Sequence, residues 1–325
     1  MRRGSVVITH PEKLLFPADG ITKGELARYY EAVAPAMLPH LRGRPVTMER
    51  FPAGIERKGF IQKDVSKLAP EWLEQVVVPK KGGQSSHALV SDERALSWMI
   101  NLNTITPHIW VSRAPELDAP DLCVFDLDPS QEDDAALRAA ALLVRDTLAE
   151  LGLESAIKTS GSKGFHIAVA LDRTTDFETL WPFSHAVGSL LVKRYPEVFT
   201  QEFIKADRAG RILIDTGRNG LGATFAAPYA VRPRNGAPVS APCTWQEIEQ
   251  GQVGPRTFTL RNLPERLAQL GDVWSNLAAR PLSLTHSVAK LATLLTVDDL
   301  AQSRAASVRR PKPRNAPRGN RKSSE

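Results

Sequence analysis

The chain has 325 residues, of which 42% are hydrophobic, and a formal net charge of +6. This length accommodates one large or two modest domains, and the two cysteines, Cys123 and Cys243, do not make a disulfide framework. No apolar run approaches the twenty or so residues that span a bilayer, and the start Met1-Arg2-Arg3-Gly4 lacks the apolar stretch of a signal peptide. We therefore expect a protein of the reducing cytoplasm with no membrane partner.

The N-terminal region predicts an amphipathic helix. Thr22-Lys23-Gly24-Glu25 has the form of a capping box, and apolar residues recur at helical spacing from Leu26 to Met37. Lys23 would lie in the first turn, where free amide groups favour a phosphate. The pattern breaks between Pro79 and Ser86, which predicts either the boundary of an N-terminal sub-domain ending near residue 85 or a surface loop.

Three aspartates end β-prone runs. Asp126 and Asp128 close the run Leu122–Asp128, and because alternate side chains of a strand share a face, their carboxylates would project together. Asp215 ends a second run, Arg211–Asp215. Three carboxylates supply the hard oxygen ligands that can hold two divalent cations. A lone Asp-x-Asp pair is more often a strand-end turn, but the third aspartate and a nearby glycine-rich loop favour a metal site.

That loop is Ser160-Gly161-Ser162-Lys163-Gly164-Phe165-His166, between strands predicted at 156–159 and 165–171. Its glycines let the backbone approach a ligand closely, Lys163 supplies a positive charge for phosphate, and Ser160 can donate a hydrogen bond. The spacing is not that of a Walker loop. A strand histidine is usually structural, but the position of His166 beside a phosphate loop favours a functional role.

Helices are expected from Glu132 to Gly152 and from Phe177 to Tyr195, each between motif-bearing strands, and the region after Pro264 is expected to be helical and peripheral. This alternation predicts a mixed α/β core. The positive charge is concentrated in the tail, where eight Lys or Arg stand against one acid from Arg304 onward. We predict that residues 301–325 form a disordered basic tail, which is either a solubilising linker or a salt-dependent attractor of DNA phosphates.

Together these segments resemble the polymerase domain of bacterial DNA ligase D, a member of the archaeo-eukaryotic primase superfamily. The resemblance covers most of the chain in the family's order, through Thr9–Lys13, Thr22-Lys23, Arg42–Thr47, Gly59–Lys63, the acidic and loop motifs, and Ala227–Arg232. It implies a primase-like catalytic core of mixed sheets flanked by helices over residues 1–300. It also implies a template-directed DNA or RNA nucleotidyltransferase that fills gaps and extends ends in double-strand break repair by non-homologous end joining.

By position, the resemblance implies a role for each motif residue. The catalytic ligands of two Mn²⁺ or Mg²⁺ ions would be Asp126, Asp128 and Asp215. The nucleotide would be bound by Ser160, Lys163, Gly164, His166, His108, Arg208, Arg232 and, less directly matched, Arg50. Lys13 and Lys23 would grip a 5′-phosphate, and Phe60 would stack on a template base with Lys63 nearby. Without the resemblance, the lysines would be interpreted as solvated charges and Phe60 as a core residue.

Two positions depart from the family pattern. Arg218 stands where relatives usually carry glutamine, and this cation near the triphosphate either tightens nucleotide binding or leans outward. His10 stands where asparagine is usual beside Lys13, and its DNA contact would be pH-sensitive.

The resemblance also implies partners: DNA gaps or ends with a 5′-phosphate, nucleoside or deoxynucleoside triphosphates, the end-binding protein Ku and a separate DNA ligase, in a bacterial cytoplasm near the nucleoid. Two alternatives stay open. One is a non-catalytic DNA-end-binding module of the same fold. The other is a haloacid-dehalogenase-like phosphatase, because Phe125–Asp128 also resembles that family's nucleophile strand.

Overall fold

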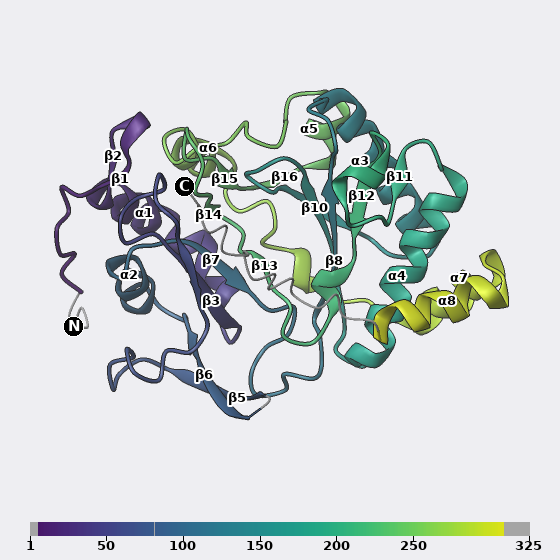
Figure 1. Cartoon of the computed structure of the whole chain (residues 1–325), viewed down its shortest axis with the longest axis horizontal. Coiled ribbons are helices and arrows are strands. Elements are labelled where there is room, and N and C mark those ends of the chain that lie inside the picture. Colours follow the sequence, from purple (N-terminus) through teal and green to yellow (C-terminus); the bar gives the residue numbers. More distant parts are fainter. Residues whose placement is uncertain (1–5, 81, 309–325) are drawn as a thin grey trace, which may run out of the picture.

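The computed structural model describes residues 6–80 and 82–308, which are organised around two β-sheets (Figure 1). The first sheet has the strand order β11-β12-β8-β10-β9-β16, and only the pair β11–β12 is parallel. Its strands are β8 (Leu122–Asp128), β9 (Ala156–Thr159), β10 (Phe165–Ala170), β11 (Phe199–Thr200), β12 (Ile212–Asp215) and β16 (Pro242–Cys243). The four strands predicted around the motifs are therefore confirmed.

The second sheet is antiparallel, with the order β13-β7-β3-β6-β5, and β4 pairs with β3. Its strands are β3 (Pro45–Arg50), β4 (Phe60–Gln62), β5 (Gln75–Lys80), β6 (Gly83–Leu89), β7 (Thr104–Ile109) and β13 (Phe225–Ala226). Pro79 and Ser86 lie in the paired strands β5 and β6, so the break in the sequence pattern is a hairpin of this sheet. Because β13 comes from the C-terminal half, both halves of the chain complete this sheet.

Two helices pack against the first sheet: α3 (Asp134–Glu150) and α4 (Phe177–Arg194), both within two residues of their predicted bounds. Each begins at an aspartate whose carboxylate accepts a backbone hydrogen bond, Asp133 from Ala136 and Asp176 from Thr179. Leu180 and Leu191 of α4 are fully buried in the core, and each such side chain contributes roughly 1.5–3 kcal/mol. The helices thereby hold in place the strands that carry the three aspartates.

The helix α1 (Lys23–Leu41) begins as predicted, because the Thr22 hydroxyl accepts a hydrogen bond from the Glu25 amide at 3.2 Å. The second half of the predicted capping box is replaced by an ion pair of Glu25 with Arg261 at 3.1 Å. α1 packs on α2 (Glu93–Asn101). Among the described helices, none is long and apolar enough to cross a membrane.

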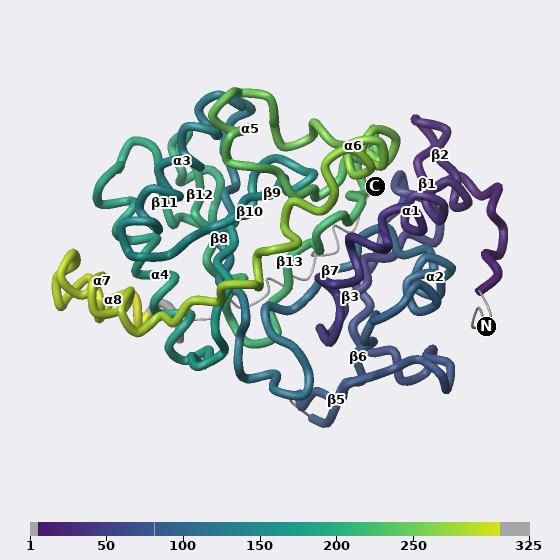
Figure 2. The backbone as a smooth tube through the Cα atoms, turned by 180° about the vertical axis from the view of Figure 1, so that it is seen from behind, coloured from purple at the N-terminus to yellow at the C-terminus, as the bar shows by residue number. Residues whose placement is uncertain are grey.

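The remaining elements are short or peripheral: β1 (Leu14–Phe16), β2 (Ile21–Thr22), β14 (Ala230–Val231), β15 (Val239–Ser240), α5 (Trp245–Glu249), α6 (Leu263–Leu270), α7 (Leu284–Leu294) and α8 (Val297–Val308). The predicted helical character after Pro264 is confirmed. Figure 2, which views the molecule from behind, shows the segment between α6 and α7 running across the face nearest the viewer. It is fixed there by the Trp274 indole, which donates to the Ile157 carbonyl at 3.0 Å, and by the Leu282 amide, which donates to the Ala170 carbonyl at 2.9 Å.

The predicted start of disorder at residue 301 is wrong, because α8 continues to Val308. The polar composition of α8 gives no sign of the contacts with α4 that stabilise it. Ser303 is buried beside Ser189 at 3.4 Å, and Asp299 pairs with Lys193 at 3.1 Å. The rest of the predicted tail, residues 309–325, lies outside the described residues.

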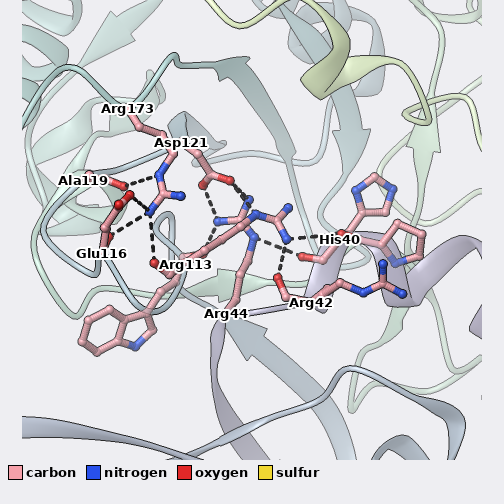
Figure 3. A network of polar contacts seen from close by, with 10 residues as sticks. His40, Arg42, Arg44, Arg113, Glu116, Ala119, Asp121 and Arg173 are labelled. Atoms are coloured by element: carbon pink, nitrogen blue, oxygen red, sulfur yellow. Dashed lines mark hydrogen bonds and ion pairs between the residues drawn. The ribbon is translucent and has the colours of Figure 1, made fainter.

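A buried cluster of charges joins the starts of β3 and β8, and so connects the two sheets (Figure 3). Arg44, just before β3, donates two hydrogen bonds to the carboxylate of Asp121, just before β8, at 2.6 and 2.7 Å. Arg113 donates to the same carboxylate at 2.7 Å. Burial lowers the pKa of Arg44 to about 10, which still leaves the guanidinium charged at neutral pH. Asp121 therefore compensates two cations where the sheets meet.

Candidate active site

The register of the first sheet brings Asp126 and Asp215 together with His166. Asp126 on β8 lies directly opposite Asp215 on β12, and on its other side it lies opposite His166 on β10. Asp128 lies two residues further along β8, on the same face as Asp126. The predicted convergence of the three aspartates is therefore present, and all four side chains line one cavity of about 300 Å³.

Two arginines compensate the three carboxylates. Arg218 Nη2 lies 3.1 Å from Asp126 Oδ2 and 3.2 Å from Asp215 Oδ2, while Arg208 Nη1 lies 3.0 Å from Asp128 Oδ2. Burial disfavours the Asp126 carboxylate, but His166 and Arg218 outweigh it and hold its pKa well below the ordinary value. Burial, together with the charges of Asp126 and Asp128, raises the pKa of Asp215 despite Arg218. The three carboxylates therefore need positive charge beside them to stay ionised together.

This donor set fits divalent cations by its chemistry, since hard carboxylate oxygens converge in one cavity. The side chains are not yet arranged around a metal. Within residues 6–80 and 82–308, no group of three or more His, Cys, Asp or Glu side chains has metal-binding geometry. The guanidinium groups of Arg218 and Arg208 take the place of cations there. The residues that would hold the ions are therefore Asp126, Asp128 and Asp215.

The glycine-rich loop faces this cluster across the cavity. Ser160 Oγ accepts hydrogen bonds from the amides of Ser162 and Gly164, both at 3.1 Å, and so closes the loop. A Cβ atom at Gly164 would lie 1.6 Å from the Leu127 carbonyl oxygen, which shows how closely the loop backbone packs on β8. Lys163 also lines the cavity, and its ammonium group has no ion-pair partner in the part of the chain that the structure describes.

Two more basic or imidazole groups complete the cavity wall. Arg232 donates to the Ser160 carbonyl at 3.4 Å, but its buried Nε has no hydrogen-bond partner among the described residues. A buried donor without a partner is costly, and an anionic ligand would satisfy it. His108 on β7 lies in the same cavity and contacts Glu49 at 3.1 Å. Burial, the largest effect, lowers the pKa of His108 and so favours the neutral imidazole.

Sequence reasoning missed Lys158, which is fully buried behind the cavity. Its Nζ lies 2.7 Å from His166 Nδ1 and also contacts the Ser240 hydroxyl. Burial and the nearby Lys158 lower the pKa of His166 to about 4. His166 Nε2 lies 3.4 Å from Asp126, so a line of side chains runs from the core to the carboxylates. A lysine within the otherwise apolar predicted strand Ala156–Thr159 was the feature of the sequence that could have indicated this role.

The cavity does not include the remaining predicted site residues. Phe60 is 45% exposed and stacks under the Arg50 guanidinium, 5.1 Å from the ring centroid. Lys23 is 2% exposed, and its Nζ donates to the Thr9 and Asn101 carbonyls, both at 2.8 Å. A phosphate contact by Lys23 would have to replace such bonds. The DNA-binding roles of Lys13, Lys23, His10, Phe60 and Lys63, and the nucleotide role of Arg50, stay predictions.

Comparisons with known proteins identify the family of this chain. The family model of the LigD primase-polymerase domain matches residues 22–274. The multifunctional non-homologous end joining protein LigD of Mycolicibacterium smegmatis is 32% identical over 84% of the chain, and that of Pseudomonas aeruginosa is 34% identical over 84%. The solved polymerase domain from Mycobacterium tuberculosis ligase D in complex with DNA superposes with a TM-score of 0.80 at 31% identity, covering 85% of this chain and 99% of that one.

The chain is therefore a member of the LigD primase-polymerase family, which is a family of nucleotidyltransferases. This confirms the resemblance and the mixed α/β fold inferred from the sequence. The chain spans about a third of the length of the curated relatives: 36% of the Mycolicibacterium protein and 33% of the Pseudomonas protein.

Proposed function

We propose that this chain is a template-directed nucleotidyltransferase that fills gaps and extends ends in double-strand break repair by non-homologous end joining. A primer 3′-hydroxyl would attack the α-phosphate of a nucleoside or deoxynucleoside triphosphate and release pyrophosphate. The observation that carries this proposal is the row of three aspartates facing a glycine-rich basic loop across one cavity. The names of the relatives support its place in end joining.

Each group around the cavity has a role in this chemistry. Asp126, Asp128 and Asp215 would hold one or two Mn²⁺ or Mg²⁺ ions, which when bound neutralise phosphate charge and lower the pKa of the attacking hydroxyl. Lys163, Arg232 and the amides of the loop would orient the triphosphate. His108, kept neutral by burial, can donate or accept one hydrogen bond at the nucleotide.

DNA would bind along the exposed edge of the second sheet. Phe60 is exposed on β4, and basic residues interleaved with an aromatic side chain suit a nucleic-acid strand. Lys13, Lys23 and His10 would contact a 5′-phosphate, and Lys63 a strand beside Phe60. The solved relative is in complex with DNA, which supports DNA as a partner of this fold. Ku and a separate DNA ligase are the partners that we propose.

One observation favours a second function, a DNA-end-binding module without catalysis. Arg218 and Arg208 already pair with all three carboxylates, as they would if the acids served only to hold the fold.

A single assay distinguishes the two functions. The protein is incubated with a labelled gapped duplex bearing a 5′-phosphate, Mn²⁺ and either ribo- or deoxyribonucleoside triphosphates, and the products are resolved by length. Templated addition that needs the metal supports the nucleotidyltransferase and reveals the sugar preference. Tight binding without addition would contradict it and support the end-binding module.

A further inference from the structure

The guanidinium of Arg218 lies between two of the carboxylates that would hold a divalent cation. One nitrogen, Nη2, lies within 3.2 Å of an oxygen from each of Asp126 and Asp215, and Nε also donates to Asp126 at 3.2 Å. These two carboxylates stand opposite each other on neighbouring strands. The Arg218 guanidinium and a divalent cation held by these aspartates would compete for the same oxygens.

The backbone of Arg218 is anchored, so only its side chain can leave. The next residue, Asn219, is fully buried, and its side-chain amide exchanges two hydrogen bonds with the backbone of Val124 on β8, at 2.7 and 2.8 Å. Asp215 is fixed similarly, because its Oδ1 accepts from the Gly217 amide at 2.8 Å. The Arg218 side chain is 38% exposed, and besides the two carboxylates it donates a long hydrogen bond of 3.4 Å to the Thr224 carbonyl.

The cavity offers the guanidinium a second class of partner. Arg218 lines the same 300 Å³ space as Lys163, Ser160 and Arg232. A triphosphate bound there would place several negative charges within reach of the side chain, and a planar guanidinium suits phosphate as well as carboxylate. A ligand that binds better when Arg218 is away from the carboxylates shifts the side chain to that position.

We propose that Arg218 is a tethered counter-ion that competes with divalent metal for Asp126 and Asp215 and is drawn away by an incoming triphosphate. It thereby couples metal binding to nucleotide binding, and the free protein holds metal weakly. This inference rests on the proposed function, because it takes the aspartates as metal ligands.

The test measures binding as well as synthesis, on the full chain. The Kd for Mn²⁺ without nucleotide is determined by electron paramagnetic resonance for the wild type and for Arg218→Gln. The Kd of a fluorescent, non-hydrolysable ATP analogue is then measured in EDTA and in saturating Mn²⁺, and the ratio of the two is the coupling. Arg234→Gln, which removes an exposed arginine two residues from Arg232, is the matched control.

Arg218→Gln should bind Mn²⁺ about tenfold more tightly than the wild type, and its coupling ratio should fall by about the same factor, because coupling is reciprocal. Arg234→Gln should match the wild type within about twofold. Arg218→Lys keeps the charge, so its Mn²⁺ affinity should stay within about threefold of the wild type. Arg218→Met, which is also neutral, is the second variant if Arg218→Gln folds poorly, and the same gain in Mn²⁺ affinity is expected of it.

Two failures are distinguishable. Equal Mn²⁺ affinities in the wild type and Arg218→Gln would overturn the proposal that Arg218 is a counter-ion, and would leave the proposed metal site unaffected. The counter-ion proposal is also overturned if Arg218→Lys binds Mn²⁺ as tightly as Arg218→Gln. Competition between the side chain and the metal would then not depend on charge. Absence of Mn²⁺ binding in every protein, with or without the analogue, would overturn the proposed metal ligands themselves.

Discussion

Asp126 and Asp215 are directly opposed residues on the antiparallel strands β8 and β12, so their carboxylates meet through sheet register alone. A slip of one residue would turn one of them to the opposite face of the sheet. The site therefore depends on the packing that fixes the register, and its residues can be tested separately for chemistry and for structure.

The substitution Asp128→Ala tests the chemistry. We expect it to reduce templated extension by at least about 100-fold, because it removes a carboxylate whose charge serves the metal and the transition state. Affinity for gapped DNA, measured by gel shift, should stay within about twofold, since Asp128 lies in the cavity and not on the proposed DNA surface. Asp118→Ala, at an exposed aspartate outside the cavity, is the control, and extension by Asp128→Ala near the wild-type rate would contradict the assignment.

The substitution Gly164→Ala tests the fit of the loop on β8. The added methyl would overlap the Leu127 carbonyl, so the loop must shift, with an expected cost of about 2–4 kcal/mol in the free energy of unfolding and loss of nucleotide binding. Gly220→Ala is a matched control, because a Cβ there would meet the Trp181 ring at an ordinary 3.5 Å. Thermal unfolding and nucleotide titration of both variants decide, and equal behaviour would refute the steric argument.

The pH dependence of stability reports on His166. Its pKa is about 4 in the folded protein and 6.5 ordinarily, so between these values the unfolded chain binds a proton that the folded chain does not. Stability should therefore fall as the pH drops from 6.5 toward 4, by about 1.4 kcal/mol for each unit of the shift. His166→Asn should flatten this part of the curve of unfolding free energy against pH. Parallel curves for the two proteins would show that His166 is protonated normally.

The substitution Asp121→Asn tests the charge cluster between the sheets. It leaves Arg44 and Arg113 without their shared carboxylate in a buried place, which should cost about 3–5 kcal/mol of unfolding free energy. Asp118→Asn makes the same chemical change at an exposed position and should alter stability by less than about 0.5 kcal/mol. Chemical denaturation measures both, and a small loss for Asp121→Asn would mean that the two cations find other partners.

Local patterns predicted most elements that position the site. The alternation that ends at Asp128 and the helical spacing from Phe177 are properties of short segments, so β8 and α4 could be predicted directly. The loop between β9 and β10 could be predicted because its glycines serve a local geometry. The roles of individual residues were assigned mainly from the resemblance to a family.

Contacts between distant segments could not be predicted in this way. The partners of Arg218 depend on the register of β8 with β12, which are far apart in the sequence. The helix α8 is stabilised by α4, more than a hundred residues away, so its polar sequence resembled a disordered tail. Neither the spacing nor the composition of a short segment predicts which distant segment it contacts.

The amide of Asn219 has a consequence for the sheet as a whole. β12 pairs with only the last three residues of β8, from Asp126 to Asp128, and the Asn219 side chain takes over at Val124 by offering both an acceptor and a donor. A single carboxamide thus acts as one residue of a missing strand. It satisfies the amide and the carbonyl of a fully buried residue, which would otherwise lack partners, so the turn that carries Arg218 also holds the middle of β8 in place.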